Sequence, residues 1–148
     1  MKKIIFLSIF FLSIINLYSQ TNSVDKNISL VKENFQKENF DKAILFSMRC
    51  LAEEPNNVLA LSFIQLSYHN LGKYEISNEY GNKILKLVDS ITIPSNILTM
   101  VALHQGLNYA YLNDDETACS FLQMAVLIGE GRYLTIGQNQ FILNNCYK

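Results

Sequence analysis

The sequence has 148 residues, a formal net charge of −1 at neutral pH, and 17% charged residues whose two signs are scattered along the chain. This length is enough for one domain with a hydrophobic core and is too short to divide comfortably into two. Nucleic-acid binding has no basic patch to support it. After residue 20 no apolar run approaches membrane-spanning length, so we expect no membrane insertion of that part.

Residues 1–19 have the layout of a secretory signal peptide. Lys2 and Lys3 precede an apolar run over residues 4–17, and Ser19 offers a small residue for cleavage. The run is shorter than the roughly 20 residues that a helix needs to span a bilayer, so removal is favoured over the alternative of an uncleaved N-terminal anchor. We expect an exported protein, periplasmic or secreted, whose mature domain is residues 20–148 with a net charge of about −3.

The mature part shows helical periodicity, and an alternation with period two is nowhere sustained. Apolar side chains recur on one helical face in two segments: Val24, Ile28, Val31 and Phe35, then Tyr74, Ile84, Leu85 and Val88. These segments therefore predict amphipathic helices.

Helix boundaries are also predicted by residue type. Gly72 suits the left-handed position that follows a helix, and Ser95 after Pro94 suits the N-cap of the next one. Asn113 with Glu116 three residues later reads as a capping box. The stretch 89–94 between these helices is not periodic.

Three segments, 39–44, 72–77 and 114–119, repeat one pattern and carry a small residue early in a helix-like stretch. The small residues are Ala43, Ser77 and Ala118. The first two lie 34 positions apart and the last two 41 apart, which is the same period with an insertion of about seven residues. An internal helical repeat is therefore expected.

This pattern resembles the tetratricopeptide repeat. Residues matching it are Ala43 and Pro55 in the first repeat, Leu61, Ile64 and Tyr68 in the second, and Gly106, Tyr109, Ala118 and Ala125 in the third. Gln65 stands where the repeat usually has glycine. The resemblance implies an all-α fold: an alpha-alpha superhelix of about three helical hairpins (24–57, 58–91 and 95–128) with a C-terminal capping segment, 129–148. Ile136, Phe141, Ile142 and Leu143 are expected to cover the apolar end of the stack.

The resemblance also implies a partner-binding groove on the concave face, lined by the first helix of each hairpin. The positions carried over are Lys32, Phe35, Gln36, Ser62, Leu66, His69, Asn70, Leu103, Leu107 and Tyr111. This set is mostly apolar and has no arginine, unlike members that grip the carboxylate tails of chaperones. The alternative is that Leu66, Leu103 and Leu107 are core residues covered by the tail.

No pattern argues for catalysis, a cofactor or a metal. The acidic run 114–116 fits the first turn of a helix, where the helix dipole favours acids. His69 and His104 have no metal-ligand spacing, and the nucleophile-turn and phosphate-loop motifs are missing from the sequence. We therefore expect a binding protein and not an enzyme.

Three cysteines in an exported chain leave one unpaired. Cys50 occupies a small buried position of the repeat, so Cys119 and Cys146 are the pair left over. A bridge needs their Cα atoms roughly 4.4–6.8 Å apart, which sequence spacing does not establish.

Two hypotheses for function follow. The first is an interaction scaffold of the envelope or exterior that binds a protein or peptide in its groove. The second is an immunity-type or inhibitor protein that occludes one specific partner. The sequence does not separate them, and it does not identify the partner.

Overall fold

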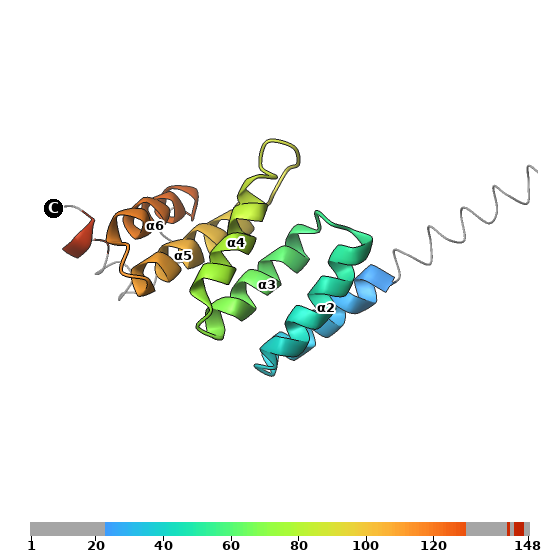
Figure 1. Cartoon of the computed structure of the whole chain (residues 1–148). Helices are drawn as coiled ribbons and strands as arrows, with labels where there is room; N and C mark the ends of the chain where they lie inside the picture. The colour runs from blue at the N-terminus through green and yellow to red at the C-terminus, as the bar shows by residue number, and fades with distance from the viewer. Residues whose placement is uncertain (1–22, 130–141, 143, 147–148) are drawn as a thin grey trace, which may run out of the picture.

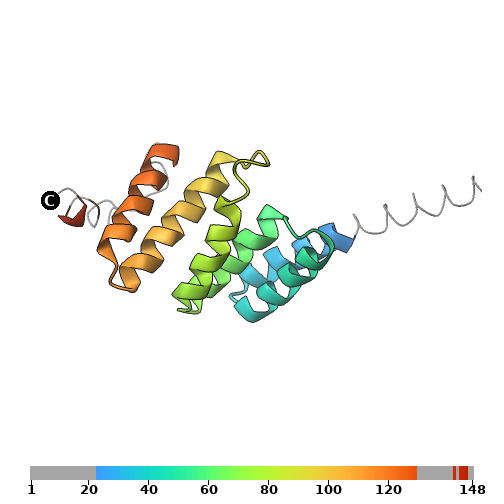
Figure 2. The ribbon, with the colours of Figure 1, turned by 45° about the horizontal axis from the view of Figure 1, so that its top comes forward.

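The computed structural model describes residues 23–129, 142 and 144–146, and in this part the chain is all-α, as predicted. The helical residues 23–36 are followed by α2 (Phe40–Glu53), α3 (Val58–Asn70), α4 (Tyr74–Leu85), α5 (Ser95–Tyr111) and α6 (Asp115–Gly129). Figures 1 and 2 show consecutive helices running antiparallel, side by side in a row. The expected signal peptide lies outside the described residues.

The helices pair into three hairpins: residues 23–36 with α2, α3 with α4, and α5 with α6 (Figure 1). Between hairpins, α2 packs on α3 and α4 on α5, and α3 also contacts α5. The first helices of the second and third hairpins are therefore neighbours. No helix of the described residues is both long and apolar enough to cross a membrane.

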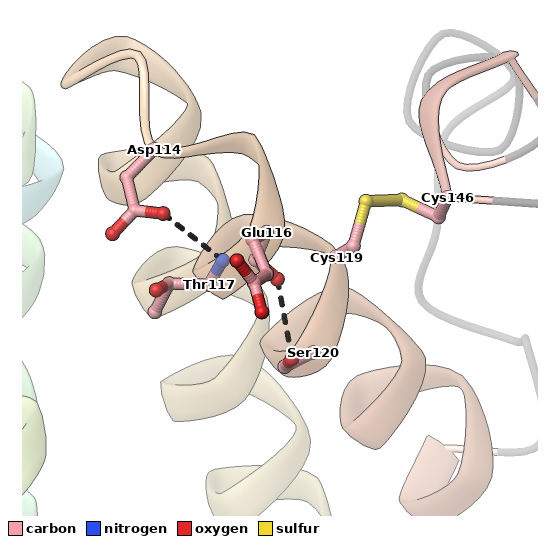
Figure 3. Close-up of a disulfide and its surroundings, with 6 residues drawn as sticks. All are labelled: Asp114, Glu116, Thr117, Cys119, Ser120 and Cys146. Atoms are coloured by element: carbon pink, nitrogen blue, oxygen red, sulfur yellow. Dashed lines mark hydrogen bonds between the residues drawn. A yellow bond between two sulfur atoms is a disulfide. The ribbon is translucent and has the colours of Figure 1, made fainter. Parts of the chain in front are cut away.

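Each hairpin turn contains one residue in the left-handed region: Glu38, Gly72 and Asn113 have φ of 58°, 70° and 61°. The prediction for Gly72 is confirmed. The capping box at Asn113 is wrong, because this residue ends the turn and Asp114 caps the helix. Its Oδ1 accepts a hydrogen bond of 3.1 Å from the Thr117 backbone N–H (Figure 3).

The insertion forms a loop between α4 and α5 that projects from the stack in Figure 1. The prediction of Ser95 as N-cap is wrong by one residue, since Pro94 is the N-cap and Ser95 begins α5. Pro94 has an extended, non-helical ψ of 137°. Ser95 already belongs to the helix, and its carbonyl accepts a hydrogen bond of 2.8 Å from the Thr99 hydroxyl.

Two glycines permit close helix packing. A Cβ at Gly106 would lie 2.6 Å from Cγ of Leu122, and a Cβ at Gly81 would lie 2.7 Å from both Cδ of Gln105 and Nε2 of Gln65. Both distances are below ordinary carbon contact, about 3.5–4.0 Å. Glycine at these positions therefore sets how closely α5 approaches α6, and α4 approaches α3 and α5.

The hydrophobic core has two clusters. The first lies between the second and third hairpins and comprises Leu61, Ile64, Tyr80, Ile84, Ile93 and Val101. The second lies at the C-terminal end of the stack and comprises Ala102, Leu103, Leu122, Ala125 and Ile142. Ile142 thus covers this end as expected, whereas Ile136, Phe141 and Leu143 lie outside the described residues.

A disulfide joins Cys119 on α6 to Cys146 in the tail, with a Cα–Cα distance of 5.3 Å (Figure 3). It anchors the tail segment that carries Ile142. Cys50 is free and buried, and burial raises the pKa of its thiol above the ordinary value. A small, neutral core residue fits that environment.

Candidate functional site: an apolar groove beside a buried polar network

An apolar groove of about 310 Å³ runs between the end of the helix 23–36, α3 and the first half of α5. Its lining is Phe35, Leu59, Ser62, Phe63, Gln65, Leu66, Asn96, Ile97, Met100 and Val101. Phe35 packs edge-on against Phe63, with ring centroids 5.3 Å apart. No charged residue is part of this lining, so the groove offers apolar surface with a few amide and hydroxyl groups.

Three of the predicted groove residues line it: Phe35, Ser62 and Leu66. The Ser62 hydroxyl donates to the Val58 carbonyl of its own helix at 2.8 Å, so it is already hydrogen-bonded. Lys32 and Gln36 are exposed on the helix 23–36 but do not line the groove.

Leu103 and Leu107 lie elsewhere. Leu103 is 7% exposed and belongs to the second core cluster, and Leu107 packs against that cluster. Placing Leu103 in an open groove is therefore wrong. The third hairpin is the last one within the described residues, and Ile142 of the tail packs into the same cluster. The alternative interpretation as core holds for these two leucines, whereas Leu66 lines the groove.

His69 and Asn70 lie one helical turn beyond Leu66 on α3, and Tyr111 lies at the end of α5 with its ring centroid 6.2 Å from that of His69. Asn70 is exposed and donates to the Leu66 carbonyl at 2.7 Å. Tyr111 is 60% exposed. Tyr74 stacks on it with ring centroids 4.6 Å apart. The structure thus brings aromatic rings from α3, α4 and α5 together near the C-terminal ends of α3 and α5.

A buried polar network connects the same three helices. Nδ2 of Asn108 donates to Oγ of Ser77 and to Oδ1 of Asn78, both at 2.8 Å. The Ser77 hydroxyl donates to the Gln65 carbonyl at 2.8 Å. Oδ1 of Asn108 is paired with Nδ1 of His69 at 2.5 Å. Side chains and backbone of α3, α4 and α5 are thereby fixed relative to one another.

This network determines the tautomer of His69. The single hydroxyl hydrogen of Ser77 is used on Gln65, so Asn108 must donate to Ser77 and present its carbonyl oxygen to His69. Nδ1 of His69 therefore carries a hydrogen, and in the neutral ring Nε2 has a free lone pair.

His104 lies beside His69, with ring centroids 4.8 Å apart and planes at 88°. Its Nδ1 is 2.8 Å from the Met100 carbonyl, which can only accept, so this nitrogen also carries a hydrogen. Burial lowers the pKa of His104 to about 4, and the neighbouring His69 adds to the effect. The ring is therefore neutral at physiological pH and its Nε2 is an acceptor.

Sequence reasoning missed the pairing of His69 with His104 because only short helical spacings were considered. Their separation is close to one repeat, and residues about one repeat apart lie on neighbouring helices of a stack. Met100, Phe63 and Ile97 were missed as groove residues, although each lies on the first helix of a hairpin. The described residues contain no group of three or more His, Cys, Asp or Glu side chains arranged to hold a metal ion.

No protein-family model matches the sequence, and none of the curated proteins compared with it matches either. Solved structures do match in fold. The N-terminal domain of stress-induced protein-1 (STI-1) from C. elegans gives a TM-score of 0.70 at 11% identity, covering 84% of this chain and 95% of that one.

Two further solved structures have a similar fold. The second TPR domain of human RPAP3, solved with the HSP70 peptide SGPTIEEVD, gives 0.69 at 15% identity, covering 87% of this chain and 99% of that one. The Sgt2 TPR domain from Aspergillus fumigatus gives 0.66 at 19% identity, covering 83% and 76%. The described chain therefore has the tetratricopeptide-repeat fold, as its sequence resemblance predicts.

Proposed function

We propose that this protein is an interaction module, without catalytic activity of its own, that binds an apolar peptide segment of a partner protein in the groove between the helix 23–36, α3 and α5. The observation that carries the proposal is the groove itself. Met100, which lines it, leaves 38% of its surface exposed, and aromatic and aliphatic side chains surround it. Such side chains anchor peptides by burying apolar surface.

The fold supports this use. One structure of the same fold holds a peptide, which shows that such a stack can present a peptide-binding surface. Three of the last four residues of that peptide, SGPTIEEVD, are acidic. The present groove has no charged lining residue, so we propose that its ligand is anchored by aliphatic or aromatic side chains and not by a terminal carboxylate.

The test is selection from a random peptide library followed by a matched pair of variants. Selected peptides should be enriched in aromatic and aliphatic residues. Met100→Glu should weaken their binding by about tenfold or more, because a carboxylate in the groove is desolvated by the bound peptide. Leu45→Glu is the control, since Leu45 is a 49% exposed apolar residue of α2 outside the groove.

Equal loss of binding in both variants, or none in Met100→Glu, would place the peptide elsewhere on the molecule. Far-ultraviolet circular dichroism of both variants guards against unfolding as the cause. Both substituted side chains are partly exposed in the parent, so the helical content should not change.

We further propose that the protein acts outside the cytoplasm. The charged, apolar and small-residue succession of residues 1–19 supports export, and an oxidising compartment is where a Cys119–Cys146 disulfide would persist. Cell fractionation of the full-length protein tests the location. Recovery in the cytosolic fraction alone would reject it.

A further inference from the structure

The faces of α3 and α5 that line the apolar groove continue beyond it. Met100, which lines the groove, is followed one turn later on α5 by His104, and Leu66 is followed one turn later on α3 by His69. Residues three or four apart share a helical face. The histidine pair is thus continuous with the groove, and the exposed Tyr111 lies beside it, with the ring centroids of His69 and Tyr111 6.2 Å apart. We name His69, His104, Tyr74 and Tyr111 together the aromatic end.

The aromatic end presents hydrogen-bond acceptors. Both Nδ1 atoms are held as donors inside the protein, by Asn108 and by the Met100 carbonyl. Within the described residues neither Nε2 has a hydrogen-bond partner, and both residues are partly exposed. A neutral imidazole whose Nδ1 carries the hydrogen offers only a lone pair at Nε2. A ligand group that bonds to such a neutral ring must therefore donate.

The aromatic faces favour a positive charge on that donor. Tyr74 covers one face of the Tyr111 ring, and 60% of Tyr111 remains exposed. Cations are attracted to the faces of such rings. Lys73, the cation that follows α3, is placed over the Tyr68 ring instead, 5.8 Å from its centroid.

The dipoles of α3 and α5 act in the same direction, whereas α4, which begins at Tyr74, presents its N-terminus here and opposes them in part. His69 lies in the last turn of α3, and Tyr111 is the last residue of α5. The carbonyl ends of helices carry partial negative charge, which favours cations. Neither last turn contains Lys or Arg to offset it.

From these contacts we infer that the aromatic end is a subsite for an ammonium or guanidinium group, so that the partner segment carries Lys, Arg or a free amine beside its apolar anchor. This inference rests on the proposed function of the groove and specifies its ligand. The preference is opposite to that expected for a site that grips a carboxylate.

The experiment uses two small probes that differ in charge and share an apolar ring: 2-phenylethylammonium and 3-phenylpropionate. Each is titrated into isotope-labelled protein with EDTA present to remove adventitious metal. Chemical shifts of the Met100 methyl, the histidine rings and Tyr111 report the position of binding. We expect 2-phenylethylammonium to bind about fivefold more tightly, the ratio that corresponds to one cation–aromatic contact at a partly exposed site.

Two variants locate the source of the preference. His104→Phe keeps a ring and removes the acceptor, and its only structural bond is to a carbonyl of its own helix. Tyr111→Ala removes the exposed aromatic face. Each should reduce the charge preference to about twofold or less, while Leu127→Ala, at an 80% exposed position of α6, should leave it unchanged.

Equal or tighter binding of 3-phenylpropionate overturns the inference, and so does the absence of shifts with both probes. A preference that survives both His104→Phe and Tyr111→Ala also overturns it. The groove proposal is judged separately, by selected-peptide binding in Met100→Glu. Loss of that binding with no charge preference would leave the groove in place and remove only the cationic subsite.

Discussion

Replacing Gly106 by alanine tests the close approach of α5 and α6. The new Cβ would lie 2.6 Å from Cγ of Leu122 and 3.1 Å from the Ala118 carbonyl oxygen. Leu122 is fully buried in the second core cluster, so it cannot move into solvent. Overpacking of this kind costs about 1–3 kcal/mol, and alanine returns about 1 kcal/mol of helix propensity. We expect a net loss of about 0–2 kcal/mol in the free energy of unfolding.

A double-mutant cycle separates the clash from any general effect. Leu122→Ala alone should cost about 2–5 kcal/mol. Combined with Gly106→Ala, the alanine methyl enters the space that Leu122 leaves, so the double variant should be more stable than the sum predicts, by about 1–3 kcal/mol. Urea unfolding followed by circular dichroism measures all four proteins.

The control in this cycle is Gly72→Ala. No atom lies within 4 Å of a Cβ there, and the cost comes from φ of 70° alone. It should cost about 1–2 kcal/mol and add independently to Leu122→Ala. If the Gly106 cycle is also additive to within about 0.5 kcal/mol, the reasoning from close packing fails.

Three other predictions concern export, redox state and pH. Protein isolated from the envelope or medium should begin at or near Gln20 by intact mass, and a mass that retains residues 1–19 would show an anchor. Alkylation before and after reduction with peptide mapping should find Cys119 linked to Cys146 and Cys50 free, whereas three reactive thiols would contradict the bridge. His104 has its pKa lowered from 6.5 to about 4 in the folded state, so as the pH falls below about 6.5 the unfolded state takes up the proton first and stability declines. Between about pH 7 and 4.5 the parent should lose up to roughly 2–3 kcal/mol more than His104→Phe in urea unfolding, and equal losses would show that His104 is not held neutral.

The arrangement of hairpins could be predicted because it follows from sequence period. The small residues Ala43 and Ser77 are one repeat apart, and the same spacing with an insertion leads to Ala118. A helix pair can approach closely only where such residues meet, so their spacing determines the fold. Gly72 was predictable for a similar reason, since few residues adopt a left-handed turn without cost.

Helix caps were harder to predict, because one residue type suits both the hairpin turn and the N-cap that follows it. Asn113 can cap a helix or adopt the left-handed region, and Asp114 beside it can also cap. The choice depends on where the preceding helix ends, and α5 ends at Tyr111. Asn113 then completes the turn and Asp114 becomes the cap.

The polar network could not be predicted, because its members come from different repeats. Nδ1 of His69 meets Asn108, 39 positions later, and Asn108 meets Ser77, 31 positions earlier. These contacts depend on how far α5 is shifted along α3. The insertion between α4 and α5 means that this shift cannot be calculated from the repeat period. Ser62 and Leu66 of the second hairpin could be predicted as groove residues, whereas Leu103 and Leu107 of the third pack in the cluster that also contains Ile142 of the tail.

Gln65 shows how the repeat accommodates a departure from its pattern. Glycine is usual at this position of the first helix, and a glutamine there should keep the second helix away. The structure supplies the space from the opposite side, because Gly81 on α4 lies where a Cβ would be 2.7 Å from Nε2 of Gln65. That amide is used, donating to the Val101 carbonyl of α5 at 3.3 Å. The packing thus requires a small residue at one of two facing positions. Here the small residue is Gly81 on α4, so Gln65 on α3 can link the second hairpin to the third.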